Sequence, residues 1–180
     1  HAADGAVLGV WGEYGSEDGQ LNKPSGLACD TANNIFVVDT LNHRVQKFTK
    51  DGRFLTNWGR YGTGEGEFRM PWGIALDADG NVYVADWRND RVQKFTADGD
   101  FIFQFGKTGR GDGEFLRPAG LAVDSDYDIY VVDWGNNRVQ LFNPDGRYVE
   151  KFLGDATMSE PAIAALRTRL RTARIRDSAP

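Results

Sequence analysis

One phrase occurs three times in this chain at a spacing of 47 residues. The stretch "VVDTLNHRVQKF" from Val37 returns as "VADWRNDRVQKF" from Val84 and as "VVDWGNNRVQLF" from Val131. The same shift aligns further positions without a gap. Among them are Pro24/Pro71/Pro118, Gly26/Gly73/Gly120, Asn42/Asn89/Asn136 and Gly52/Gly99/Gly146. Self-similarity at a period of this length indicates a fold built from equal, stacked units.

Each unit contains four short stretches with strand character, separated by turn residues. In the middle unit these are residues 73–77 (GIALD), 82–86 (VYVAD), 91–97 (RVQKFTA) and 101–106 (FIFQFG). They are rich in the β-branched and aromatic residues that strands favour. None of the units shows the 3.6-residue apolar stripe of a helix. Four antiparallel strands per repeat predict an all-β propeller with one blade per repeat.

The repeats do not add up to a closed ring. Residues 4–12 (DGAVLGVWG) align with residues 51–59 (DGRFLTNWG), which end a blade. We therefore expect one outer strand and then three full blades within residues 1–154. Such a partial ring would leave apolar blade faces open. Two arrangements would close it: a longer chain that supplies more blades, or a homodimer that completes a six-bladed ring.

The repeat stops near residue 154, and the remaining residues, 155–180, have a helical pattern. In "SEPAIAALRTRLRTARI", Ser159 suits an N-cap, and Ile163, Leu166 and Leu170 share one face. The sequence therefore predicts a C-terminal amphipathic α-helix with arginines on its other sides. It is expected to pack on the rim of the propeller or between blades, with membrane-surface or partner binding as the alternative.

The repeated motif resembles that of a known family. The pattern P-x-G-[LI]-A-x-D, then [IV]-[FY]-V-x-D-x-x-N-x-R-V-Q-x-F, then D-G, is similar to the NHL repeat and occurs three times within residues 5–154. The resemblance implies a propeller, most often one with six blades. It leaves function open, because NHL-type propellers include protein-binding modules, RNA-binding modules, sensor domains and a few lyases.

An Asp and an Arg flank the four-residue loop in every copy, which places them opposite each other at the mouth of a hairpin. We expect ion pairs that fix the shape of the loop, each worth about 0.2 to 1 kcal/mol on the scale for exposed pairs. A catalytic set would occur once per ring and not once per blade, so the pairs are interpreted as structural. They are Asp39 with Arg44, Asp86 with Arg91, and Asp133 with Arg138.

The lone cysteine, Cys29, aligns with Leu76 and Val123 in the first strand of each unit. It is therefore expected to lie buried between blades and to be inert. One cysteine excludes an internal disulfide and leaves the compartment undetermined.

The charge balance bears on the partner. The net charge is −5, and residues 155–180 hold five Arg against three acidic residues, which leaves −7 for residues 1–154. A surface of that sign disfavours nucleic acid. None of the apolar runs approaches the roughly 20 residues of a membrane span.

The sequence offers no set of residues for catalysis or metal binding. His43 is the only histidine besides His1, and its counterparts are Asp90 and Asn137, so it is interpreted as a turn residue. The Gly-rich stretches 62–68 and 109–115 lack the Lys-Ser/Thr of a phosphate-binding loop and are interpreted as flexible connectors. We expect neither a cofactor nor a metal.

Function is expected where the three copies differ. The connectors between blades and the loops between second and third strands emerge on one side, which we call the loop face. Tryptophan, tyrosine and basic residues are frequent at its variable positions, and such residues often anchor protein partners. The candidates are Arg60, Tyr61, Trp72, Trp87, Arg88, Lys107, Arg110, Arg117 and Trp134.

These patterns favour a non-enzymatic module that binds a protein or peptide, or senses a ligand, through the loop face. An alternative is a segment of a six-bladed, metal-dependent lyase or lactonase, with ligands on the inner strands. A second alternative is an RNA-binding propeller, which the negative charge of residues 1–154 disfavours.

Overall fold

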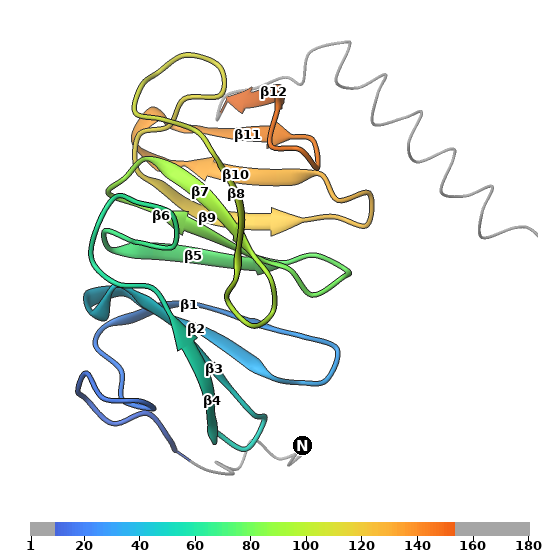
Figure 1. The fold of residues 1–180 in the computed structure, drawn as a ribbon. Helices are drawn as coiled ribbons and strands as arrows, with labels where there is room; N and C mark the ends of the chain where they lie inside the picture. The colour runs from blue at the N-terminus through green and yellow to red at the C-terminus, as the bar shows by residue number, and fades with distance from the viewer. Residues whose placement is uncertain (1–9, 154–180) are drawn as a thin grey trace, which may run out of the picture.

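The computed structural model describes residues 10–153. Within that range the chain forms three sheets of four antiparallel strands, stacked in sequence order (Figure 1). This confirms the predicted all-β architecture of four-stranded blades. Blade 1 contains β1 (Pro24–Cys29), β2 (Ile35–Asp39), β3 (Arg44–Phe48) and β4 (Phe54–Trp58). Blade 2 contains β5 (Pro71–Leu76), β6 (Val82–Asp86), β7 (Arg91–Phe95) and β8 (Phe101–Phe105). Blade 3 contains β9 (Pro118–Val123), β10 (Ile129–Asp133), β11 (Arg138–Phe142) and β12 (Tyr148–Leu153).

The turns form where the sequence predicts them. Gly52, Gly99 and Gly146 adopt φ of 80°, 96° and 74° in the turn before the outer strand, a region that L side chains rarely adopt. One-turn 3₁₀ helices, η1 (Thr40–Asn42) and η2 (Trp134–Asn136), span the β2–β3 and β10–β11 loops. Within residues 10–153, no helix combines the length and the apolar character that a membrane span requires.

Two expectations fall at the ends of the chain. The predicted C-terminal α-helix and the boundary after residue 154 lie outside the described residues. Most of the predicted outer strand, residues 4–12, lies outside them as well. Its described part, residues 10–12, is not a strand, because it pairs with none of the three sheets.

The apolar contacts that join the blades include one cross-strand row of side chains on each blade. On blade 1 the row is Val38, Val45 and Trp58, which lie opposite one another in β2, β3 and β4. Val38 and Val45 are fully buried. We call such a row the leading row, and the face of the next blade that covers it the receiving face. The receiving face of blade 2 is formed by Ile74, Leu76, Val82, Val84 and Phe95.

The joint between blades 2 and 3 uses the equivalent positions. The leading row of blade 2 is Ala85, Val92 and Phe105. Val92 and Phe105 pack in one cluster with the receiving face of blade 3, and the ring centroids of Phe105 and Phe142 are 4.8 Å apart. The other members of that face are Leu121, Val123, Ile129 and Val131.

The inner strands approach so closely that glycine is required. A Cβ on Gly26 would lie 2.6 Å from the carbonyl oxygen of Trp72 in the neighbouring inner strand. A Cβ on Gly73 would overlap the carbonyl oxygen of Ala119 in the same way. Because both neighbours are backbone atoms, a methyl group at either glycine would push two blades apart.

Among residues 10–153, no further blade covers the outer faces of the two end blades. On blade 1, Cys29 is exposed and Leu27 is 69% exposed, so the expectation of a buried Cys29 is wrong. Its counterparts Leu76 and Val123 pack in the joints, but no blade precedes blade 1 among the described residues. On blade 3, Val132 of the leading row is 40% exposed.

Candidate functional site

The repeated Asp–Arg pair is part of a buried network. In blade 2, Oδ2 of Asp86 accepts hydrogen bonds from Nε of Arg91 at 2.9 Å and from Nδ2 of Asn89 at 2.8 Å. Its Oδ1 accepts a bond from the backbone N–H of Arg69 at 2.8 Å. The corresponding Arg-to-Asp distances are 2.9 Å in blade 1 and 2.7 Å in blade 3.

Burial changes the expected energetics of this network. The side chains of Asp39, Asp86 and Asp133 are fully buried, so the scale for exposed pairs does not apply. Burial raises the pKa of Asp86, although the hydrogen bonds to Arg69, Asn89 and Arg91 act in the opposite direction. Removing one partner of such a pair leaves a buried charge without compensation, which is strongly destabilising.

The same network holds the Gly-rich connector. Arg91 donates hydrogen bonds to the carbonyl oxygens of Thr63, Gly64 and Glu67 at 2.7 to 2.8 Å. Gln93 donates to Glu67 O at 2.8 Å and accepts from Gly66 N at 3.0 Å. The expectation of flexible connectors is therefore wrong for residues 62–68. Their carbonyl groups are the ligands of a buried guanidinium group, and the connector presents its outer side on a fixed frame.

A hydrogen bond across each joint positions the loop face. Nδ1 of His43 accepts a hydrogen bond from the backbone N–H of Met70 at 3.1 Å. Oδ1 of Asp90 accepts the equivalent hydrogen bond from the backbone N–H of Arg117 at 2.7 Å. All four residues have left-handed φ, between 53° and 58°. Burial and the nearby Arg69 lower the pKa of His43, with Asp39 opposing them, which favours the neutral ring that can accept this bond.

Four of the predicted residues form one cluster on the loop face. The rings of Trp72 and Trp87 lie 5.7 Å apart, centroid to centroid. The guanidinium of Arg117, which comes from blade 3, lies 4.5 Å from the Trp87 centroid, and that of Arg88 lies 5.3 Å from it. Trp72 is 43% exposed and Arg88 is exposed. We call these four residues the tryptophan–arginine cluster.

An apolar hollow of about 350 Å³ adjoins this cluster between blades 1 and 2. Trp72 lines it together with Leu41 and Met70, and Lys23 and Ser25 are also part of its lining. Ser25 Oγ hydrogen-bonds the carbonyl oxygen of Trp72 at 2.7 Å, which ties the two blades together at this point. Trp72 thus belongs to both the cluster and the hollow, so one ligand can contact both.

The remaining candidates lie apart from the cluster. Tyr61 is 63% exposed and packs edge-on against His43, 5.1 Å away, while the guanidinium of Arg69 lies 5.7 Å from its ring. Arg60 and Lys107 are paired with Glu67 and Glu114 at 2.9 Å and 3.4 Å. Arg110 borders a separate hollow on blade 3.

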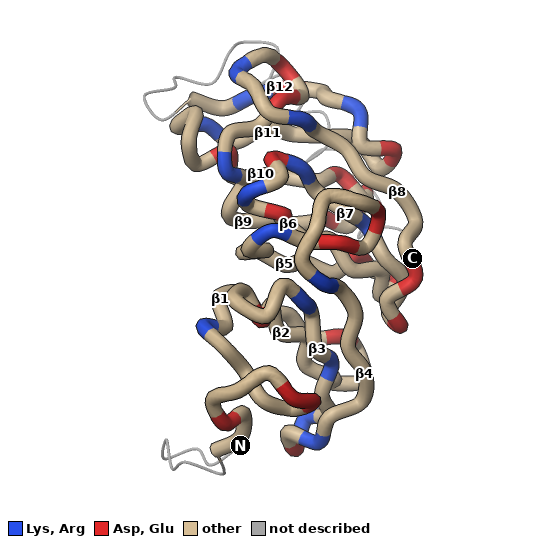
Figure 2. The backbone as a smooth tube through the Cα atoms, turned by 60° about the vertical axis from the view of Figure 1, so that its left-hand side comes forward, with Lys and Arg blue, Asp and Glu red and all other residues tan. Residues whose placement is uncertain are grey.

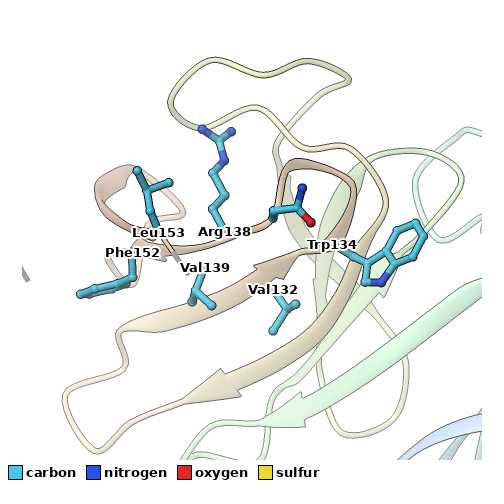
Figure 3. Close-up of a pocket in the computed structure, with 7 residues that line it drawn as sticks. Val132, Trp134, Arg138, Val139, Phe152 and Leu153 are labelled. Atoms are coloured by element: carbon cyan, nitrogen blue, oxygen red, sulfur yellow. The ribbon is translucent and has the colours of Figure 1, made fainter. Parts of the chain in front are cut away.

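Trp134 does not lie beside the other two tryptophans. It is 62% exposed and borders the open end of blade 3 (Figure 3). The repeat pattern groups it with Trp87 because both occupy the same repeat position, but among residues 10–153 Trp87 meets a following blade and Trp134 does not. Arg69 is absent from the sequence-based candidates, and its only signal is that it differs from Asn22 and Leu116 at the equivalent positions.

Charges of both signs are distributed over the blades. Figure 2 shows Lys and Arg positions in all three blades, with Asp and Glu positions between them. Within residues 10–153, no three His, Cys, Asp or Glu side chains are grouped closely enough to hold a metal ion. The side chains that gather on the loop face are therefore aromatic and cationic ones.

Comparisons with known proteins agree with this architecture. The family model of the NHL repeat matches residues 21–48, and a model described as a 6-bladed beta-propeller matches residues 76–159. These matches confirm that the chain resembles the NHL-repeat β-propellers. Protein brain tumor of Drosophila melanogaster is 49% identical to this chain over 41 residues, which are 23% of this chain and 4% of that protein. The chain thus spans a small part of the length of this relative.

Solved structures also share the fold of this chain, and two of them illustrate it. A streptogramin B lyase structure has a TM-score of 0.59 at 21% identity, covering 75% of this chain and 42% of its own. The RRP9 WD40 repeats have a TM-score of 0.62 at 19% identity, covering 77% of this chain and 41% of their own. At these identities the likeness concerns the propeller fold alone.

Proposed function

We propose that this NHL propeller is a non-enzymatic binding module whose loop face docks a protein or peptide. The observation that carries the proposal is the contact between the tryptophan–arginine cluster and the apolar hollow, which share Trp72. An apolar side chain of the partner is expected to enter the hollow. Acidic groups of the partner are expected to pair with Arg88 and Arg117 at its side.

The physical argument rests on how the cluster is held. Trp87 is supported by Arg117 on one blade and by Trp72 on its own, so both rings are positioned before a partner arrives. Positioned tryptophans and arginines lose little conformational entropy on binding, and they are enriched among the residues that dominate binding energy. The clamped connectors and the hydrogen bonds across the joints keep this geometry fixed.

The enzymatic alternative receives less support. A metal-dependent lyase or lactonase needs ligands on the inner strands, where this chain presents Lys23, Ser25, Met70, Trp72 and Arg117. Amine, thioether, indole and guanidinium groups are poor partners for a catalytic divalent metal. RNA binding would use the same tryptophans for stacking, but the net −7 of residues 1–154 disfavours it.

The test is selection of peptides from a random phage-displayed library on the wild-type chain. The best peptide is then titrated against Trp72→Ala and Trp87→Ala. Each variant is expected to weaken binding at least tenfold, because truncation of a hot-spot residue costs about 2 kcal/mol or more. Trp134→Ala is the control: it removes an exposed tryptophan from outside the cluster and is expected to leave binding unchanged.

Three outcomes contradict the proposal. One is a selected peptide that binds all three variants equally. Another is a large drop in melting temperature of Trp72→Ala and Trp87→Ala, which shows that both rings are part of the core. The third is tight binding of a single-stranded RNA pool with a steep salt dependence, which favours the RNA alternative.

A further inference from the structure

The open face of blade 3 carries an apolar row like the two leading rows that are buried in the joints. Val132, Val139 and Phe152 lie opposite one another in β10, β11 and β12. Figure 3 shows them on one side of the sheet, with Arg138 and Leu153 on the other. Val38 and Val45 at the equivalent positions of blade 1 are 0% exposed, whereas Val132 is 40% exposed. Blade 3 thus presents a complete leading row that no blade covers among residues 10–153.

The smaller parts of a joint are also present on blade 3. Gly120 occupies the position of Gly26 and Gly73, and a Cβ there would meet only the side chain of Val132, at 3.1 Å. Asn137 occupies the position of His43 and Asp90, with the same left-handed φ of 53°, and it is exposed. A carboxamide oxygen can accept the backbone N–H that an incoming blade would offer.

The other half of the joint lies on blade 1. Leu27 and Cys29 are exposed on its receiving face, at the positions that Ile74 and Leu76 hold in blade 2. Lys23 has a left-handed φ of 54°, close to the 53° of Met70, whose amide is bonded across the joint. Blade 3 therefore carries a leading row and blade 1 a receiving face. These are the two surfaces that pack together in both joints within the molecule.

One part of the receiving face of blade 1 is already occupied. The ring of Trp11 lies 4.7 Å from that of Phe48, and a Cβ on Gly52 would overlap it. Trp58 and Phe105 fill the equivalent sockets of blades 2 and 3, on Phe95 and Phe142. Trp11 precedes Phe152 by 141 residues, which is three repeats, so the two side chains are equivalent competitors for one socket.

We propose that the leading row of blade 3 docks on the receiving face of blade 1 in a second copy of this chain, and that Phe152 displaces Trp11 from the socket at Phe48. Two such joints link two copies into a ring of six blades, the number in the description of the matching family model. The contact is head to tail, and two copies of the three described blades give the six blades of the ring. Trp11 then acts as a plug that opposes assembly.

The test is the solution mass of the chain by light scattering over a dilution series. The wild-type chain is expected to reach twice its 20.0 kDa as concentration rises. Gly120→Ala adds a methyl group that within one copy requires only a small shift of the Val132 side chain, but that the carbonyl of Ser25 in the partner copy would meet. Leu27→Lys places a charge on the receiving face. Each variant is expected to remain monomeric, and a mixture of the two is expected to form a dimer through its one intact joint.

Competition between Trp11 and Phe152 for one socket predicts that removing the Trp11 side chain strengthens dimerisation. Trp11→Ala removes exposed aromatic surface yet is expected to strengthen dimerisation by about tenfold, because Phe152 no longer has a competitor. Phe152→Ala is expected to weaken it. The control is Ile102→Lys, which places the same charge on an apolar residue that is 43% exposed on the middle blade and is expected to leave the mass unchanged.

Several results would overturn this inference. These are a chain that stays monomeric at every concentration even as Trp11→Ala, a dimer that survives both Gly120→Ala and Leu27→Lys, or a mixture of those two variants that remains monomeric. Weaker dimerisation of Trp11→Ala would exclude the competition with Phe152. Trp72→Ala and Trp87→Ala are expected to leave the mass unchanged, so failure of the peptide proposal and failure of this one can be distinguished.

Discussion

Blades 2 and 3 have nearly the same sequence motif but different surroundings. Blade 2 is covered on both faces, and Ala85 and Val92 of its leading row are fully buried. Blade 3 is covered on one face, and Val132 at the position of Ala85 is 40% exposed. In a repeat protein, whether an apolar side chain is buried therefore depends on the presence of a neighbouring blade and not on the residue type. This dependence also explains why Cys29 is exposed although Leu76 packs in a joint.

The hairpin network shows the opposite behaviour. The Asp–Arg contact is as short in blade 3 as in blade 2, at 2.7 Å and 2.9 Å, and both aspartates are fully buried. Each network closes on its own blade and on the connector that precedes it, so it needs no following blade. The molecule thus has one stabilising device that depends on neighbouring blades and one that does not.

The largest expected effect tests this independence. Asp86→Ala and Asp133→Ala should each lower the free energy of unfolding by about 3 to 5 kcal/mol, because each leaves a buried arginine unpaired. The losses should be similar although blade 3 has an open face. Urea denaturation of the two variants measures them. A much smaller loss for Asp133→Ala would show that the network draws its strength from the covering blade.

An intermediate effect sharpens the contrast between covered and open rows. Val38→Ala removes two buried methyl groups from the joint of blades 1 and 2 and should cost about 2 kcal/mol. Val132→Ala makes the same change at the equivalent position of blade 3 and should cost close to nothing in the monomer. Both are measured by denaturation at low protein concentration, where a second copy is not bound. Equal losses would mean that the open face is covered by part of this chain.

The smallest effect concerns the hydrogen bond across the first joint. The pKa of His43 is lowered in the folded state, so its contribution to stability is present above the ordinary histidine pKa and is lost as pH falls through the folded value. Protonation of Nδ1 removes the acceptor for the N–H of Met70. His43→Asn introduces the residue found at the equivalent position of blade 3 and keeps an acceptor.

The variant is therefore expected to lose the decline in stability between about pH 7 and pH 5, which thermal melts over that range would detect. The joint between blades 2 and 3 provides an internal reference, because there an aspartate, Asp90, and not a histidine accepts the corresponding hydrogen bond. An unchanged pH profile in His43→Asn would show that His43 makes no pH-dependent contribution to the joint.

The sequence by itself determined the period, the four strands per blade, the turns and the facing of each Asp with its Arg. All of these depend on residues close together within one repeat, where strand alternation and turn chemistry act locally. The resemblance to the NHL repeat also followed from the sequence, because its motif occurs three times. The same local reasoning predicts that the nine loop-face candidates share one side.

Only the tertiary structure decided which apolar faces are covered, that the ion pairs are buried, and that Trp72, Trp87, Arg88 and Arg117 meet while Trp134 does not. These features arise between blades: Arg117 reaches Trp87 from 30 residues away in the chain, across a joint. The repeat predicts the same environment for equivalent residues of every blade. Each face of a blade is buried only by a neighbouring blade, however, and each end blade has only one neighbour among the described residues. Local periodicity therefore predicts the blade, and the packing of one blade on the next determines the surface.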